Sequence, residues 1–235
     1  MKKIGIIGAM EVEVNYLRSL MKDGAKKTEA GSIVFEEGAI GGTNVVLVRS
    51  GIGKVNAALC AQRLILQFGC THIINTGIAG SMAENLGVLD FVVSTDAVQH
   101  DVNATGFGYK LGQIPQMDTF SFQADSAMIK AAMDAFKENE LSKGHKMIGG
   151  RIATGDQFIS DKATKEQIQA NFAPACVEME GCAIAQACYL NKTPFVIIRC
   201  MSDNADDLKE NDYAFNESVA GELSAKIVQH MIEKI

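Results

Sequence analysis

The chain has 235 residues, a length that a single α/β domain can reach and that suffices to bury a large hydrophobic core. Its hydrophobic and charged fractions, 47% and 21%, are those of an ordinary soluble globular protein. The formal net charge is −6 and no cluster of Lys and Arg stands out, so we expect no nucleic-acid partner and favour a neutral or cationic substrate.

In the first part of the chain, short apolar strands alternate with helices. Glu11 and Glu13 break the first apolar run after only a few residues, so we expect no signal peptide, and no later apolar stretch is long enough to span a membrane. Hydrophobic periodicity and turn residues predict a strand over 3–9, a helix from about 11 to 21, strands over 32–37 and 43–50, a helix over 54–68, a strand over 71–75 that runs into a small-residue loop over 76–81, and a strand over 91–95.

Residues 99–124 interrupt this alternation, because they show no sustained period. A long irregular segment within a compact domain usually serves as a lid or a contact loop. The rest of the chain predicts a helix over 125–139, a strand over 146–154, another helix, an apolar stretch from Pro174 to Asp203 and a C-terminal helix over 216–234.

The alternation of strands and helices over the whole length predicts an α/β fold. We expect a mixed, mostly parallel central sheet flanked by helices on both faces, in a single domain over 1–235. Ligands bind such sheets where strands end. The chemistry is therefore expected among the loops at 8–13, 50–53, 76–81, 155–159 and 199–203.

Two glycine-rich turns fall short of known nucleotide-binding motifs. Gly5-Ile-Ile-Gly8 lacks the full G-x-G-x-x-G pattern, and the turn at Gly51-Ile-Gly53-Lys54 has Val48 at the first P-loop glycine and Val55 in place of Ser or Thr. We interpret both as tight strand-to-helix turns, which can still bring backbone N–H groups close to a small ligand.

Histidines and cysteines give no sign of a metal site. The four histidines are scattered and the six cysteines show no CxxC spacing, so we expect no metal and no other cofactor. Reduced cysteines in a hydrophobic core are typical of a cytoplasmic protein. There is also no GxSxG elbow that would indicate a nucleophilic serine.

The remaining candidates for catalytic residues are carboxylates, and each of them could instead have a purely structural role. Glu11 and Glu13 both suit the dipole of the helix that they begin, an interpretation that we prefer for Glu11. The two lie about 200° apart around the helix axis and should point to different sides.

Three acidic residues of the apolar stretch have alternatives of their own. Instead of a functional role, Glu178 could simply be exposed to solvent. Glu180 could simply stabilise the dipole of the following helix. For Asp203, a structural ion pair with Arg199 and a functional role are equally open on residue type alone.

Six short motifs follow one another in a fixed order: Gly8-Ala-Met-Glu-Val-Glu13, Ser50-Gly-Ile-Gly-Lys54, Asn75-Thr-Gly-Ile-Ala-Gly80, Gly155-Asp-Gln-Phe-Ile159, Val177-Glu-Met-Glu180 and Arg199-Cys-Met-Ser-Asp203. Together they are far more specific than any one of them. With this set over nearly its whole length, the chain resembles the bacterial 5′-methylthioadenosine/S-adenosylhomocysteine nucleosidases of the nucleoside phosphorylase superfamily.

The resemblance implies hydrolysis of the N-glycosidic bond of adenosine-type thioethers, with release of adenine and the thio-ribose. Asp203 would be the general acid at adenine N7, and Ser202 would orient its carboxyl group. Glu13 would activate the attacking water, with Arg199 nearby. Carboxylates near the first strand would repel phosphate, which favours hydrolysis over phosphorolysis.

The resemblance also implies a set of substrate contacts. Glu180 would bind the ribose 2′ and 3′ hydroxyls over Met179, Phe158 would stack on the purine and Ile159 would bind it through backbone hydrogen bonds. Met10, Ile52, Phe107 and Tyr213 would wall the ribose and the alkylthio tail, and Pro115 would reach the site of the partner subunit in a homodimer. Ala79, Gly80, Val177 and Glu178 complete the expected set, although Glu178 has no clear catalytic task.

Three positions depart from the family pattern. Ile78 stands where many members have Ser, which in the family can assist the water-binding carboxylate; Tyr213 and Ala104 stand where Phe and Val are common. The preference among methylthioadenosine, S-adenosylhomocysteine and 5′-deoxyadenosine is therefore open. Futalosine-type nucleosidases and a non-catalytic nucleoside-binding protein are the alternatives.

Overall fold

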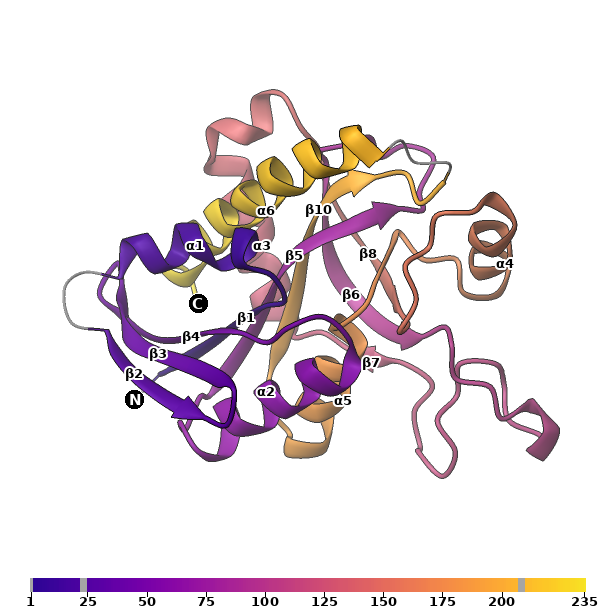
Figure 1. Cartoon of the computed structure of the whole chain (residues 1–235), viewed down its shortest axis with the longest axis horizontal. Coiled ribbons are helices and arrows are strands. Elements are labelled where there is room, and N and C mark those ends of the chain that lie inside the picture. The colour runs from indigo at the N-terminus through magenta and orange to yellow at the C-terminus, as the bar shows by residue number, and fades with distance from the viewer. Residues whose placement is uncertain (1, 22–24, 207–209) are drawn as a thin grey trace.

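The structure, a computed structural model, describes residues 2–21, 25–206 and 210–235, with side chains in the last range from Asn216 onward. One sheet forms the middle of the molecule (Figure 1). Its strands are β1 (Ile4–Gly8), β2 (Lys26–Ala30), β3 (Ile33–Ile40), β4 (Thr43–Arg49), β5 (His72–Ser81), β6 (Phe91–Gln99), β7 (Phe122–Gln123), β8 (Met147–Thr154), β9 (Cys176–Glu178) and β10 (Phe195–Asp203).

The strand order is β10-β6-β8-β9-β5-β1-β4-β3-β2, and β10 also pairs with β5. Strands β5, β10, β6, β8 and β9 therefore close into a ring. Parallel pairs join β4, β1, β5 and β10, whereas β2 and β3 are antiparallel. The sheet is mixed, as the sequence predicts.

Helices cover both faces of the sheet, which confirms the predicted α/β class. The helices are α1 (Glu11–Leu20), α2 (Lys54–Leu66), α3 (Ser126–Glu138), α4 (Lys162–Phe172), α5 (Gly181–Asn191) and α6 (Glu210–Ile232), with short 3-10 turns at Thr105–Phe107 and Glu140–Lys143. In Figure 1, α1, α3 and α6 lie above the sheet, α2 and α5 lie below it, and α4 stands at the side. Two apolar cores follow from this layering, one under each group of helices.

The small-residue segment 76–81 is not a loop, and that prediction is wrong. It continues β5 to Ser81, because β10 pairs with it on one side, up to Gly80 opposite Asp203, and β9 pairs with its end. Small side chains let three strands approach each other closely at this point. Sequence analysis also missed β2, a strand of mostly polar residues without a buried position, and placed the start of α6 too late.

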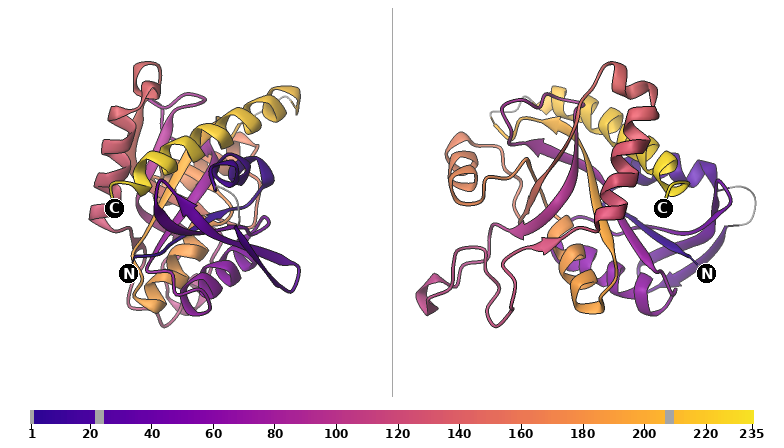
Figure 2. Two further views of the ribbon diagram at one scale, coloured as in Figure 1. Left: turned by 90° about the vertical axis from the view of Figure 1, so that its left-hand side faces the viewer. Right: turned by 180° about the vertical axis from the view of Figure 1, so that it is seen from behind.

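The irregular segment between β6 and β7 projects from the body of the molecule, as Figure 1 and the right view of Figure 2 show. Phe107, at the end of its 3-10 turn, is 88% exposed. Elsewhere, all six cysteines are buried and none forms a disulfide. Within the described parts of the chain, no helix is both long and apolar enough to cross a membrane.

Candidate active site

A cavity of about 300 Å³ lies between the carboxyl-terminal parts of β1, β5, β9 and β10. All five segments in which the sequence analysis expected the chemistry contribute to its wall, although 76–81 and 199–203 are strand and not loop. The predicted residues that line it are Met10, Glu13, Ile52, Ala79, Gly80, Phe158, Val177, Glu178, Met179, Glu180, Ser202 and Asp203, together with Ala9 and Ile78. The cavity is therefore the candidate active site.

Arg199 is fully buried behind the cavity, with carboxylates around it. Its Nη2 donates to Asn75 Oδ1 at 2.7 Å and to Glu178 Oε2, and lies 3.6 Å from Glu180 Oε2. Burial lowers the pKa of Arg199, but the charges of the surrounding glutamates raise it more, so the guanidinium stays protonated. Among the residues that the structure describes, its Nε and Nη1 have no hydrogen-bond partner. One cation thus organises several carboxylates.

Glu178 is buried, so the interpretation that it is merely exposed to solvent is wrong. Its Oε2 pairs with Arg199 and accepts hydrogen bonds from the main-chain N of Glu180 at 3.1 Å and of Gly181 at 2.7 Å. Thr154 Oγ1 donates to its other oxygen. Because these N–H groups begin α5, the helix-dipole role considered for Glu180 belongs to Glu178. Glu178 fixes Arg199 to the start of α5.

Glu11 and Glu13 point to different sides of α1, as their spacing predicts. Glu11 pairs with Arg18 near the surface, whereas Glu13 is only 2% exposed and lines the cavity. A carboxylate this deeply buried needs partners, because an unpaired charge inside a protein is strongly unfavourable.

Main-chain donors supply the partners of Glu13. Its Oε2 accepts from Ala9 N at 2.6 Å and Met10 N at 2.9 Å, and its Oε1 accepts from Ile78 N at 3.0 Å. Burial raises the pKa of Glu13 above its usual value, against the charge of Arg199 and these donors. A raised pKa makes the carboxylate a stronger base. Since the bond from residue 78 comes from its backbone, Glu13 is held in place without a serine there.

Glu180 occupies the N-cap position of α5, but its side chain makes no capping hydrogen bond to that helix. Instead its Oε1 accepts from Gly53 N at 2.9 Å, so the Gly51–Gly53 turn does bring a backbone N–H to the site. Burial and the negative charge of Glu178 raise the pKa of Glu180 to about 7, against the charge of Arg199. Near neutral pH this carboxyl group therefore exchanges its proton readily.

Asp203 forms no ion pair with Arg199, so the structural alternative for this residue is wrong. An irregularity in the pairing of β10 between Met201 and Asp203 redirects the chain at this point. Ser202 Oγ donates to Asp203 Oδ2 at 2.6 Å, and Ala205 N donates to Oδ1 at 2.7 Å. Asp203 is 4% exposed and held by neutral donors.

The two residues predicted to face the purine differ in position. Phe158 lines the cavity and is 54% exposed, whereas the side chain of Ile159 is buried in a cluster with Val177 and Met82. A backbone contact to the base, which the resemblance implies for Ile159, needs no exposed side chain.

Two further predicted residues, Phe107 and Pro115, are not among the described residues that line this cavity. Phe107 is 88% exposed and is not among the residues that line this cavity, so the expectation that it walls the ribose and the alkylthio tail stays a prediction. Pro115 lies exposed on the same segment. The side chain of Tyr213 falls outside the described residues.

Sequence analysis missed residues that support the charged cluster. Thr154 links Glu178 to the start of α5, since its Oγ1 also accepts from Cys182 N at 2.8 Å. Asn75 binds Arg199 through its Oδ1 and donates from Nδ2 to Ile7 O at 2.9 Å, which ties three strands together. The available signal was their position at the ends of the predicted strands 71–75 and 146–154, although in the structure β5 continues beyond Asn75. Within the described residues, no group of three or more His, Cys, Asp or Glu side chains is arranged to hold a metal ion.

Comparison with known proteins accounts for this arrangement. The family model described as the phosphorylase superfamily matches residues 3–233. The chain belongs to the phosphorylase superfamily. A 5′-methylthioadenosine/S-adenosylhomocysteine nucleosidase of Shewanella frigidimarina is 43% identical over 235 residues, which cover 99% of this chain and 100% of that protein.

Solved structures of the superfamily share the fold. A 5′-methylthioadenosine/S-adenosylhomocysteine nucleosidase of Colwellia psychrerythraea, in complex with adenine, matches with a TM-score of 0.94 and 41% identity over 99% of this chain and 95% of that one. The futalosine hydrolase of Helicobacter pylori matches with a TM-score of 0.93 and 30% identity over 100% and 98%. The resemblance drawn from the six motifs is confirmed.

Proposed function

We propose that this chain hydrolyses the N-glycosidic bond of 5′-methylthioadenosine and S-adenosylhomocysteine and releases adenine and the thio-ribose. The observation that carries the proposal is that two buried carboxyl groups of different surroundings, Glu13 and Asp203, line one cavity. The full-length relatives named as nucleosidases of these two substrates support it.

At one end of the cavity Asp203 gives a proton to adenine N7 as the bond from C1′ to N9 breaks, so that adenine leaves as a neutral molecule. The carboxyl group then becomes a carboxylate, and the hydrogen bonds from Ser202 Oγ and Ala205 N stabilise that form. These donors support the role of Asp203 as general acid.

The ribose develops oxocarbenium character as the bond breaks. Glu180 accepts hydrogen bonds from the ribose 2′ and 3′ hydroxyls, and Met179 packs against the sugar. Glu13 takes a proton from water, whose oxygen forms the new bond to C1′. The raised pKa of Glu13 supports this role, because water needs a strong base.

Water is the nucleophile that this site favours over phosphate. Glu13 and Glu180 both line the cavity, and the nearby guanidinium of Arg199 is already paired with Glu178. A phosphate dianion would meet carboxylates without a free cation among the described residues that line the cavity.

We also propose a homodimer whose interface lies on α2 and α5. Val55, Leu59 and Leu66 of α2 are 70%, 52% and 71% exposed and recur at helical spacing, and Leu190 of α5 is 65% exposed. Contiguous exposed apolar side chains mark contacts between proteins. Phe107 and Pro115 then reach the cavity of the partner subunit. Sedimentation of a Val55→Glu, Leu59→Glu variant tests this: a monomer is expected, and a dimer like the wild type would contradict it.

The substrates are thioethers derived from methionine, so we place the protein in methionine salvage. The six cysteines without disulfides support a cytoplasmic location.

A substrate panel tests the proposed function. The purified protein is given methylthioadenosine, S-adenosylhomocysteine, 5′-deoxyadenosine and futalosine, and free purine is measured with and without phosphate. We expect adenine from the first two substrates at a rate that phosphate does not change. Formation of ribose 1-phosphate would assign the chain to the phosphorylases, turnover of futalosine alone would assign it to the futalosine hydrolases, and tight binding without product would indicate a binding protein.

A further inference from the structure

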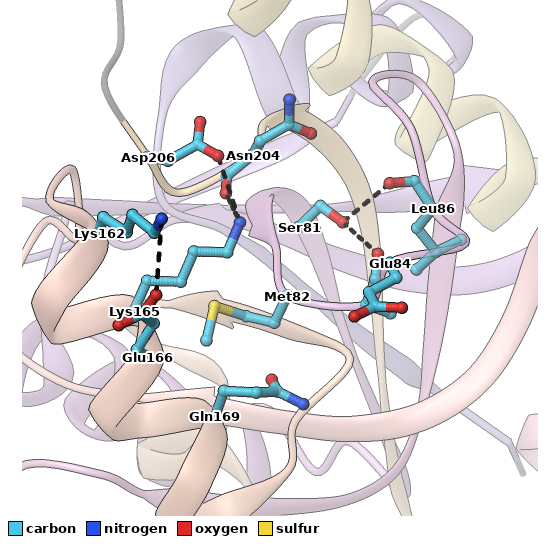
Figure 3. A pocket seen from close by; sticks show the side chains of 11 residues that line it. Ser81, Met82, Glu84, Leu86, Lys162, Lys165, Glu166, Gln169, Asn204 and Asp206 are labelled. Carbon is cyan, nitrogen blue, oxygen red and sulfur yellow. Dashed lines mark hydrogen bonds and ion pairs between the residues drawn. The ribbon is translucent and has the colours of Figure 1, made fainter.

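Beside the active site, a second cavity of about 610 Å³ lies between α4 and the loop that follows β10 (Figure 3). Two lysines of α4 line it. Lys162 pairs with Glu166 of the same helix at 3.8 Å, whereas Lys165 points across the cavity toward the loop. Lys165 Nζ donates to the main-chain O of Asn204 and lies 3.5 Å from Asp206 Oδ2. Lys165 therefore ties α4 to the residues that follow the proposed acid.

The carbonyl group that Lys165 contacts belongs to the same peptide unit that contacts Asp203. In the Asn204–Ala205 peptide, the oxygen accepts from the ammonium group and the N–H donates to Asp203 Oδ1 at 2.7 Å. A charged donor on the oxygen polarises the peptide, which strengthens the N–H as a donor on its other side. One peptide unit thus connects the cation of Lys165 to the carboxyl group of Asp203.

The same peptide is held in an unfavourable conformation. Ala205 has a φ of 52°, in the left-handed region that residues with a Cβ rarely adopt, and it is fully buried. Such a conformation is unfavourable for a residue with a Cβ and persists only where its surroundings enforce it. Contacts from Lys165 on one side and Asp203 on the other supply that enforcement.

α4 also follows directly from the segment that carries Phe158. Asp161 caps the helix, its Oδ1 accepting from Thr164 N at 2.9 Å, so the start of α4 is fixed relative to that segment. Because Lys165 is in the first turns of the same helix, it joins the purine-facing segment to the loop that bears the acid.

We propose that Lys165 is a positioning residue for Asp203. Its ammonium group holds the Asn204–Ala205 peptide so that the N–H of Ala205 stays directed at Asp203 and stabilises the carboxylate that forms when the proton passes to the purine. This role rests on the proposed function. It predicts an effect on the chemical step and not on ground-state binding of the nucleoside, because Lys165 does not line the substrate cavity.

Steady-state kinetics on methylthioadenosine test the proposal with Lys165→Met, Lys165→Gln, Lys165→Arg and the matched control Lys162→Met. We expect kcat to fall about tenfold in Lys165→Met and Lys165→Gln, a loss below that of a direct hydrogen bond to a charged group, while KM stays within about twofold. Lys165→Arg should regain most of kcat, because it keeps a cation in reach of Asn204 O. Lys162→Met should match the wild type, and thermal melting should show every variant folded.

Each other result overturns the inference. A wild-type kcat in both Lys165→Met and Lys165→Gln, or a rise in KM with kcat retained, would show that Lys165 does not act on Asp203. An equal loss in Lys165→Arg would show that the positive charge is not what matters. If the wild type and Lys162→Met release no adenine, the proposed function fails and this inference fails with it; if they do and the Lys165 variants are unaffected, only the inference fails.

Discussion

The two ends of the active-site cavity hold carboxyl groups in opposite surroundings. At the end nearer α1 and α5, Glu13, Glu178 and Glu180 are gathered around the buried guanidinium of Arg199. At the other end Asp203 meets only neutral donors, Ser202 Oγ and Ala205 N. The first group is a crowded cluster of anions with one cation, and the second is a single acid without one.

This difference supports the proposal that one cavity both accepts and supplies a proton. Burial raises the pKa of Glu13, and burial together with the negative charge of Glu178 raises that of Glu180, so these groups are suited to accept protons. The hydrogen bonds printed for Asp203 come from neutral donors, Ser202 Oγ and Ala205 N, and this surrounding supports the proposal that Asp203 is the group that serves the leaving base.

The largest effect is expected where Glu13, the carboxylate proposed to activate water, is replaced. Glu13→Gln keeps the shape of the side chain but cannot take a proton, so kcat should fall about 10²- to 10⁴-fold, the range for general bases. Rates of adenine release measure the loss, and thermal melting serves as the control for folding. A rate like that of the wild type would remove Glu13 from its proposed role.

A methyl group at Gly77 should break the charged cluster by steric overlap. A Cβ there would collide with Arg199 Nη1 and Glu13 Oε1, both buried, so Gly77→Ala should destabilise the protein by about 1–3 kcal/mol, the usual effect of overpacking. It should also lower kcat strongly. Urea unfolding and kinetics test this against Gly144→Ala, where a Cβ meets open space. Equal behaviour of the two variants would contradict the tight packing of Arg199 against Glu13.

The pH dependence of binding should report Glu180. With its pKa raised to about 7, the group is mostly neutral at pH 6 and mostly a carboxylate at pH 8. The carboxylate is the better acceptor for ribose hydroxyls, so affinity for the nucleoside should rise about tenfold between these values. In Glu180→Gln this dependence should disappear. A dependence that persists unchanged in the variant would assign it to another group.

The same group should affect stability with a defined sign. Because the pKa in the folded protein lies above the usual value of 4.5, the folded state binds the proton more tightly than the unfolded state. The contribution of Glu180 to stability is therefore present below pH 4.5 and is lost as pH rises through about 7. Urea unfolding of Glu180→Gln and the wild type across this range measures the difference, which should grow in favour of the variant with rising pH.

A smaller effect is expected at the end of the cavity that holds Asp203. Ser202→Ala removes the hydrogen bond of 2.6 Å to Asp203 Oδ2 but leaves the one from Ala205 N. We expect kcat to fall about tenfold or less, with KM unchanged, since only one of two donors is lost. Ser19→Ala, at an exposed position that donates to Tyr16 O, is the control. A change in KM alone would mean that Ser202 binds substrate instead of orienting the acid.

Local sequence rules predicted much of the fold and of the site. The helical angle separated Glu13 from Glu11, and the rule that ligands bind at strand ends gathered the correct loops. Alternation of apolar segments with helices was enough to predict the layers of the sheet and its helices.

What sequence analysis missed depends on contacts between distant segments. The pairing of β5 with β10 and β9 turned the expected loop at 76–81 into strand, and no local signal reports pairing on both edges. Likewise, Arg199 pairs with Glu178, which is 21 positions away, and not with Asp203 of its own strand. The contact of Lys165 with Asn204 joins residues 39 positions apart and has no signature in the sequence.

The proposal that Asp203 and Glu13 have separate roles at the two ends of the cavity is tested most directly by changing the leaving group of the substrate. A 5-methylthio-ribofuranoside of 4-nitrophenol loses a stable phenolate that needs no proton, unlike adenine. We predict that Asp203→Asn lowers kcat on methylthioadenosine by at least about 100-fold but leaves kcat on the nitrophenyl compound near that of the wild type, while Glu13→Gln lowers both. An equal loss of kcat on the two substrates in Asp203→Asn would contradict the proposal that Asp203 protonates the leaving group.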